Sequence, residues 1–186
     1  MAVFVDRPLP YCRGLEARDP ATIDLVVLHC TELPDLTTAR RYGEKIHFEG
    51  SGTGVSGHYY IDRTGDIERW VEESRVAHHC IAYNQRSVGI ELVNAGRYPH
   101  WFDSRHQQPE EPYGREQLAA LEALLAHLRQ ALPALTRLAR HSDLDRGRVA
   151  ASDDPRRQVR RKIDPGPLFP WSQVLARSGL QALSAD

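Results

Sequence analysis

The distribution of apolar and polar residues predicts strands and helices mixed along the chain. Residues 21–30, ATIDLVVLHC, end in a continuous apolar run rich in β-branched side chains, which is typical of a central strand covered on both faces. Residues 37–46 are predicted to form a short helix, and the glycine-rich stretch 49–57 a loop. Within residues 58–71, two strands are expected to join at DRTGD, where Gly65 can adopt a positive φ.

The second half of the chain shows the same mixture of patterns. Residues 87–94, SVGIELVN, predict a strand with Gly89 in its interior, where backbone or a ligand can approach closely. Over residues 115–131 the leucines alternate at spacings of three and four, which predicts a helix with one apolar face that Pro133 ends. Residues 170–180 are expected to form a short closing helix that starts after its first proline.

The stretch between these helices lacks any periodicity. Residues 146–161 are polar and charged, so we expect an exposed and relatively mobile surface loop there. Strands and helices are mixed, but the helices are too few for a regular alternation of strand and helix. The pattern therefore predicts a single α/β domain with a mixed sheet.

Composition narrows the class of protein. A chain of 186 residues suits one domain, and 41% hydrophobic with 26% charged residues is ordinary for a globular protein. The formal net charge of −1 argues against a nucleic-acid partner, although the run RRQVRRK is basic. No stretch reaches the length of a membrane span.

Features of the N-terminus and of the cysteines bear on the cellular compartment. The first residues show no basic region followed by an apolar one, so we expect no secretory signal. The three cysteines are sparse and form no C-x-x-C pair, which argues against a disulfide framework. A cytoplasmic location is expected, and a periplasmic one stays open if a leader precedes this chain.

Two polar residues stand inside or at the end of apolar strands. His29 ends the first strand, where its side chain can face a cleft, although a hydrogen-bonded core or surface histidine gives the same pattern. Glu91 lies inside an otherwise apolar strand, and the alternative is that it faces solvent from an edge strand. A buried Glu91 would need a cation or hydrogen bonds, and burial would raise its pKa toward that of a useful base.

Three further candidates lie in the C-terminal third. His141 follows the run ALTRLA, and Lys162 and Asp164 precede a rigid Pro-Gly-Pro turn. Residues at i and i+2 of an extended segment point to the same side, so this cation and this carboxylate can face one point. Lys162 is also the end of the basic run, and its position alone assigns it no function.

These residue types together match one kind of chemistry. Two histidines and a carboxylate are a known ligand set for catalytic zinc, with a fourth position left for water. Zinc lowers the pKa of that water to near neutrality, and a nearby carboxylate can take its proton. A lysine can stabilise the oxyanion that forms when hydroxide adds to a carbonyl. A set complete for amide hydrolysis is therefore present, with three candidate ligands, a base and an electrostatic clamp: His29, His141, Asp164, Glu91 and Lys162.

Four segments come in the same order as in the zinc-dependent N-acetylmuramoyl-L-alanine amidases: VVLHCTE, VSGHYYIDRTGDIERWVEESRVAHH, SVGIELVN, and RHSDLD followed by RRKIDPGPLFPW. The chain resembles the AmpD-like branch of that family, which is related to the peptidoglycan-recognition proteins and to phage lysozyme-amidases. The resemblance covers residues 24–171, within one domain expected over 1–186. It implies a central mixed sheet flanked by helices, one zinc in a surface groove, and cleavage of the amide between N-acetylmuramic acid and L-alanine in muropeptides or peptidoglycan.

The resemblance also assigns roles to single residues. The two histidine ligands of the family correspond to His29 and His141, and the carboxylate ligand corresponds to Asp164. The family's lysine and glutamate correspond to Lys162 and Glu91. The gap between the second histidine and the carboxylate is longer than is common in the family, so a lengthened loop is expected at the rim of the groove. Four acids in or near this loop remain alternative ligands: Asp143, Asp145, Asp153 and Asp154.

One motif departs from the family pattern. The family's AWHAG appears here as AHHC, in which His79 matches the motif histidine. His79 is expected to line the substrate groove, and a structural role is the alternative. A module that binds peptidoglycan without cleaving it is the alternative function, but such relatives typically lose a zinc ligand. Soluble anhydro-muropeptides of cell-wall recycling and intact cell wall both remain candidate substrates, and the oligomeric state is left open.

Overall fold

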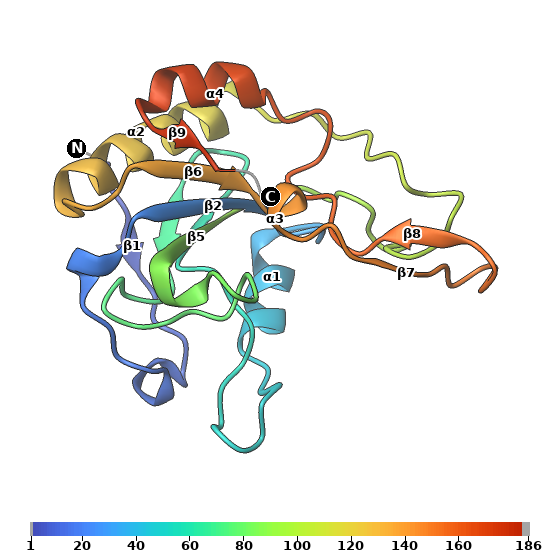
Figure 1. Ribbon diagram of the computed structural model, residues 1–186, viewed down its shortest axis with the longest axis horizontal. Coiled ribbons are helices and arrows are strands. Elements are labelled where there is room, and N and C mark those ends of the chain that lie inside the picture. Colours follow the sequence, from blue (N-terminus) through green and yellow to red (C-terminus); the bar gives the residue numbers. More distant parts are fainter. Residues whose placement is uncertain (1, 184–186) are drawn as a thin grey trace.

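The computed structural model describes residues 2–183, whose strands and helices are mixed along the chain (Figure 1). The strands are β1 (Val5–Asp6), β2 (Leu25–Cys30), β3 (Tyr59–Ile61), β4 (Ile67–Arg69), β5 (Ser87–Leu92), β6 (Arg137–Arg140), β7 (Arg148–Ala150), β8 (Gln158–Arg160) and β9 (Gln181–Ala182). The α-helices are α1 (Leu36–Gly43), α2 (Arg115–Ala131), α3 (His141–Leu144) and α4 (Trp171–Ser178).

Within residues 2–183, seven strands form one mixed sheet in the order β1-β4-β3-β5-β2-β6-β9. The strands β3, β5, β2, β6 and β9 are parallel, whereas β4 runs antiparallel to β3. The hairpin between β3 and β4 turns where predicted, and Gly65 there has a φ of 89°. The predicted α/β domain with a mixed sheet is therefore confirmed.

The centre of the sheet follows from the apolar runs. All six residues of β2 are buried, as expected of a strand covered on both faces, and β5 lies beside it as a second interior strand. The sequence did not predict β6 on the other side of β2. Only Leu138 and Ala139 of its four residues are buried, and an arginine stands at each end, so its pattern is too short to identify a strand.

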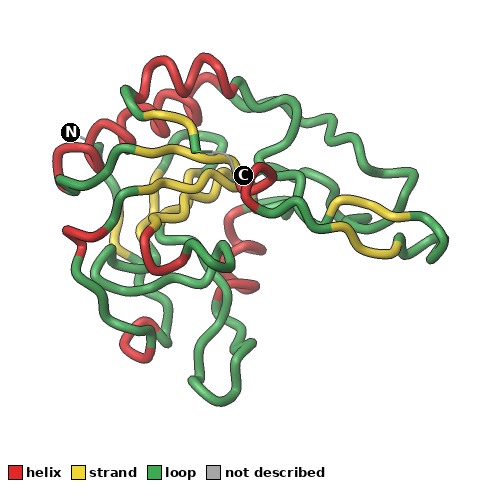
Figure 2. The backbone as a smooth tube through the Cα atoms, in the orientation of Figure 1, coloured by secondary structure: helices red, strands yellow, loops and turns green. Residues whose placement is uncertain are grey.

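Helices cover both faces of the sheet (Figure 2). The helices α2 and α4 lie over one face, where the leucines of α2 pack against alternate residues of β2 and β5. Each fully buried leucine contributes about 1.5–3 kcal/mol, so this apolar face orients the helix on the sheet. The bounds of α2 match the predicted ones, and α1 lies on the opposite side of the sheet.

The prediction of an irregular loop over residues 146–161 is wrong in part. This segment contains β7 and β8, which pair antiparallel, and the side chain of Val159 is buried. Residues 97–112 run beside it, joined by bonds such as that from the Ser152 amide to the carbonyl of Phe102, at 2.9 Å. The two segments, called the arm below, project together from one edge of the domain (Figure 1).

Candidate metal and catalytic site

Three parallel strands end side by side at one edge of the sheet. His29 is the next-to-last residue of β2 and pairs in register with Glu91 of β5. On the other side of β2, the register with β6 runs to the pair Leu28 and Arg140, so His141 follows at the level of His29. The hydrogen-bonded ladder therefore places these three candidate residues in one row, at the carboxyl ends of strands where α/β proteins commonly bind ligands.

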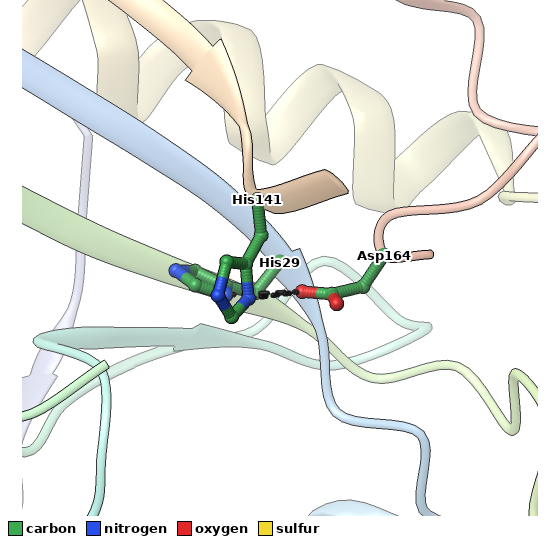
Figure 3. Close-up of side chains that lie close together, drawn as sticks. All are labelled: His29, His141 and Asp164. Atoms are coloured by element: carbon green, nitrogen blue, oxygen red, sulfur yellow. Dashed lines mark hydrogen bonds and ion pairs between the residues drawn. The ribbon is translucent and has the colours of Figure 1, made fainter. Parts of the chain in front are cut away.

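Asp164 meets the two histidines of this row. The Nδ1 atoms of His29 and His141 each lie 3.0 Å from the same carboxylate oxygen, Oδ2 of Asp164. All three residues are buried, with no more than 3% of their surface exposed. Figure 3 shows the three side chains converging from β2, from the end of β6 and from the segment that follows the arm.

The four alternative acids lie apart from this group, and each is bonded to a neighbouring side chain. The pairs are Asp143 with Arg140, Asp145 with Arg161, Asp153 with Ser104, and Asp154 with Arg156. Among the described residues, Asp164 is therefore the acid that forms a possible metal-binding group with His29 and His141.

A second trio of metal-ligand types lies on the arm, formed by His100, Asp103 and His106. Both histidines are exposed, and the carboxylate of Asp103 accepts two bonds from the guanidinium of Arg105. The carboxylate of the arm trio is therefore already paired with an arginine.

Glu91 and Lys162 face the same cavity as the buried group. Because β5 is an interior strand, the alternative that Glu91 faces solvent from an edge is excluded. Its Oε1 lies 3.9 Å from Nδ1 of His29, and Lys162 and Asp164 both line the cavity, as the i and i+2 spacing predicts. His79 also lines this cavity, so the five predicted site residues and His79 are all brought together.

Burial and charge shift the pKa values at this site. Burial, followed by the charge of Asp164, raises the pKa of Glu91 to about 8. Burial lowers the pKa of His29 to about 4. Burial also works to raise the pKa of Asp164, but the charge and hydrogen bonds of the two histidines outweigh it and hold that pKa well below its usual range. For Lys162, Asp164 and other carboxylates outweigh burial and raise the pKa, so the ammonium stays charged.

The donor set fits a metal ion. Two imidazole nitrogens and one carboxylate oxygen converge on one point, and the second oxygen of Asp164, Oδ1, is buried without a hydrogen-bond partner among the described residues. A buried carboxylate oxygen without a partner is costly, and a cation held by the trio would compensate its charge. This group can therefore bind a metal ion.

Sequence reasoning missed one residue pair that supports the site. The guanidinium of Arg97, which is 3% exposed, donates to both carboxylate oxygens of Glu32, at 2.7 and 2.9 Å. It also donates to the carbonyls of Arg160 and Arg161, at 2.9 and 3.2 Å, directly before Lys162. The sequence carried one signal for this pair, because residues of opposite charge follow two predicted apolar strands. Glu32 comes after β2, and Arg97 comes after β5.

A buried group of metal-ligand residue types beside a glutamate and a lysine, at the carboxyl ends of parallel strands, is an arrangement suited to hydrolysis. The family model described as N-acetylmuramoyl-L-alanine amidase matches residues 19–167. The chain therefore belongs to this family. It is an amide hydrolase that cleaves the bond between N-acetylmuramic acid and L-alanine in muropeptides or peptidoglycan, which confirms the predicted activity over the non-catalytic alternative.

One curated protein and two solved structures are similar to this chain. An endolysin of Enterobacteria phage K11 is 29% identical over 115 residues, which cover 61% of this chain and 72% of that protein. The amidase LysC from Clostridium intestinale URNW has a TM-score of 0.68 at 23% identity, covering 97% of this chain and 99% of the other. The amidase AmiD from E. coli, solved with a substrate, has a TM-score of 0.62 at 24% identity, covering 87% of this chain and 59% of AmiD. The two structures share the fold of this chain.

Membrane attachment and location are separate questions from activity. Within residues 2–183, no helix combines the length and the apolar character needed to cross a bilayer. The expected cytoplasmic location stays a prediction.

Proposed function

We propose that the chain is a zinc-dependent amidase in which His29, His141 and Asp164 hold the metal. Glu91 acts as the general base, and Lys162 stabilises the oxyanion. The observation that carries the proposal is the convergence of two Nδ1 atoms on one buried carboxylate oxygen, at 3.0 Å each, in the cavity that Glu91 and Lys162 also line. Two histidines and one carboxylate are a typical catalytic zinc set.

The residues around the ligands have distinct tasks in hydrolysis. When bound, zinc would supply Lewis acidity, which polarises a carbonyl and lowers the pKa of water. Glu91 takes a proton from the water that attacks the lactyl carbonyl of muramic acid. The Lys162 ammonium holds the negative charge that develops on the carbonyl oxygen. Glu91 then passes its proton to the amine of L-alanine as the carbon–nitrogen bond breaks.

The environment of Glu91 suits a base that works near neutral pH. Burial raises its pKa to about 8, and a cation held by the neighbouring trio would lower that pKa again because an opposite charge favours the carboxylate. A general base is most effective when its pKa lies near the working pH. The short separation from His29 also places Glu91 within reach of a water at the ligand trio.

Metal analysis tests the ligand assignment. The purified protein is expected to hold one zinc per chain, and chelators should remove it together with activity. His29→Ala should lose the metal. His106→Ala is the matched control, because it alters the exposed arm trio and should leave one zinc bound. Hydrolysis that persists unchanged in a chelator-treated, zinc-free protein would contradict the assignment.

A product assay tests the bond that is cleaved and the form of the substrate. The AmiD structure contains anhydro-N-acetylmuramic acid linked to a tripeptide, which supports a soluble muropeptide as the first substrate to try. Mass spectrometry of this substrate beside intact sacculi should show a free lactyl acid on the sugar and a free amine on L-alanine. Products cut within the glycan or within the peptide would contradict the proposed reaction. The relative rates on the two substrates distinguish a role in recycling from one in wall degradation.

A further inference from the structure

His79 lies against the backbone of β5 in a space that only glycine leaves open. A Cβ atom on Gly89 would lie 2.6 Å from Cγ of the His79 ring, closer than real Cβ contacts. The sequence predicted a close approach of backbone or a ligand at Gly89, and the structure places a side chain, this imidazole, there instead. The contact holds the ring in one place beside His29, with the two ring centroids 5.1 Å apart and the rings perpendicular.

The ring of His79 belongs to a chain of hydrogen bonds that starts at the candidate ligand. Nε2 of His29 lies 3.0 Å from Nδ1 of His79, and Nε2 of His79 lies 3.3 Å from Oγ of Ser87. The Ser87 hydroxyl donates to the backbone carbonyl of Tyr83 at 2.7 Å. The three residues that contribute side chains to this series of hydrogen bonds, His29, His79 and Ser87, are all buried.

The Tyr83 carbonyl at the end of this series favours one direction for the hydrogen bonds before it. A carbonyl oxygen only accepts, so the Ser87 hydroxyl donates its proton to the Tyr83 carbonyl. The Ser87 oxygen then accepts a hydrogen bond from Nε2–H of His79. A neutral imidazole with its proton on Nε2 has an acceptor at Nδ1. In that direction His29 donates from its own Nε2 and keeps the lone pair of Nδ1 for an ion held with Asp164. Without an ion, the carboxylate oxygen can only accept, so the 3.0 Å contact between Nδ1 and Oδ2 of Asp164 needs a proton on that Nδ1.

We propose that His79 is a positioning residue that selects the Nδ1-binding tautomer of His29 through Ser87. The inference rests on the proposed metal centre, because it concerns the readiness of one ligand for the ion. Partners of this kind orient ligand histidines and raise their basicity in metalloproteins. Both ring nitrogens of His79 are used within the chain, so this role differs from the direct substrate contact expected from the sequence.

Zinc affinity of a set of variants tests the proposal. His79→Ala should weaken binding about 10- to 100-fold, measured by competition with a fluorescent chelator. His79→Asn places an acceptor oxygen where Nδ1 stands and should recover most of the affinity, whereas His79→Leu restores volume without an acceptor and should not. His78→Ala is the control, since His78 bonds to the Gly54 carbonyl and lies outside the chain.

The variants separate a failure of this inference from a failure of the metal centre. Wild-type protein that binds no zinc would overturn the proposed centre and the inference with it. Wild-type protein that binds zinc while His79→Leu binds it equally well would overturn the inference alone, because volume would then suffice. Thermal unfolding of the metal-free variants shows whether any loss of affinity follows from a loss of fold.

Nitrogen NMR determines the direction of the hydrogen bonds made by His79 without any activity measurement. In zinc-loaded, ¹⁵N-labelled protein, the ring of His79 should show a protonated Nε2 and an accepting Nδ1. Ser87→Ala should remove that preference, because Nε2–H loses its acceptor. A protonated Nδ1 on His79 in the zinc-loaded wild-type protein would reverse the direction of these hydrogen bonds and overturn the proposal.

Discussion

The sheet edge and the segment after the arm supply the candidate site in different ways. His29, Glu91 and His141 stand at the ends of neighbouring parallel strands, where the hydrogen-bonded ladder sets their spacing. Lys162 and Asp164 follow the arm, outside any regular element. One half of the site is thus held by the rigidity of the sheet, and the other half depends on individual side-chain and backbone contacts.

The contacts of the second half are few and specific. Arg97, bound to Glu32 at the end of β2, holds the two carbonyls before Lys162. The Ser142 amide donates to the carbonyl of Asp164 at 2.9 Å, which ties that residue to α3 beside the second histidine. We call His29, Glu91 and His141 the sheet half of the site, and Lys162 and Asp164 with the contacts that hold them the arm half. Substitutions in the sheet half should change the chemistry and leave the backbone in place. Some substitutions in the arm half should also move Lys162 and Asp164.

The largest effect is expected at the sheet half, from Glu91→Gln. The amide keeps the size of the side chain but cannot take a proton, so kcat should fall by about 10²- to 10⁴-fold. Zinc content and thermal stability should stay close to those of the wild type. Glu122→Gln on α2, beyond the sheet from the site, is the control. Turnover near the wild-type rate would remove Glu91 from the mechanism.

Arg97→Met tests how far the arm half depends on the buried ion pair. The variant leaves Glu32 buried without its partner, which typically costs about 3–5 kcal/mol of unfolding free energy. Urea denaturation measures the loss, and activity should fall with it because the carbonyls before Lys162 lose their donor. Arg156→Met, which breaks an exposed pair with Asp154, should lower the unfolding free energy far less, because solvent screens that pair. Equal stability of the two variants would show that the pair does not hold the arm.

Lys162→Ala removes the cation of the arm half without touching a ligand. The loss of oxyanion stabilisation should lower kcat by roughly 10²- to 10³-fold while zinc remains bound. Steady-state kinetics on anhydro-muropeptide, together with metal analysis, checks both parts. An unchanged kcat would show that the charge at this position does not face the reacting carbonyl.

The pH dependence of stability provides a smaller signal from the sheet half. The folded pKa of Glu91 is raised from an ordinary 4.5 to about 8, so between these values the folded metal-free protein keeps a proton that the unfolded chain has lost. Its unfolding free energy should therefore fall as pH rises from about 6.5 to 8, by up to about 1.4 kcal/mol per pH unit. That window lies above the range in which the buried histidines contribute. Glu91→Gln should flatten this slope in urea titrations, and an identical slope in both proteins would show that Glu91 is not buried.

The smallest effect on chemistry is expected from shortening the arm between Arg148 and Gln158. This change removes the tip that bonds to residues 97–112 but leaves the row of ligands and the Arg97 contacts in place. Zinc content should be preserved, and the ratio of activity on soluble muropeptide to activity on cell wall should change. A loss of zinc would show that the arm tip supports the ligands rather than access to them.

Much of the fold could be predicted from local patterns of apolar and polar residues. The apolar run of β2, the hairpin at Gly65 and the leucine face of α2 each carry their own signal, because burial on one or two faces repeats at the period of the element. The strand β6 lacked such a signal. The pairing of β7 with β8 was also missed, since its small apolar contact is hidden among arginines.

The sequence by itself determined which residue types are available at the site, because the histidines, carboxylates and lysine and their order along the chain can be read from it directly. Only the tertiary structure decided that Glu91, His29 and His141 share one row, since strand order and register are set by pairing between distant segments. It also decided the bond between Glu32 and Arg97, 65 residues apart, and the placement of His79 over Gly89. Such contacts form where packing buries polar groups that must find partners, and no local pattern encodes which partner that is.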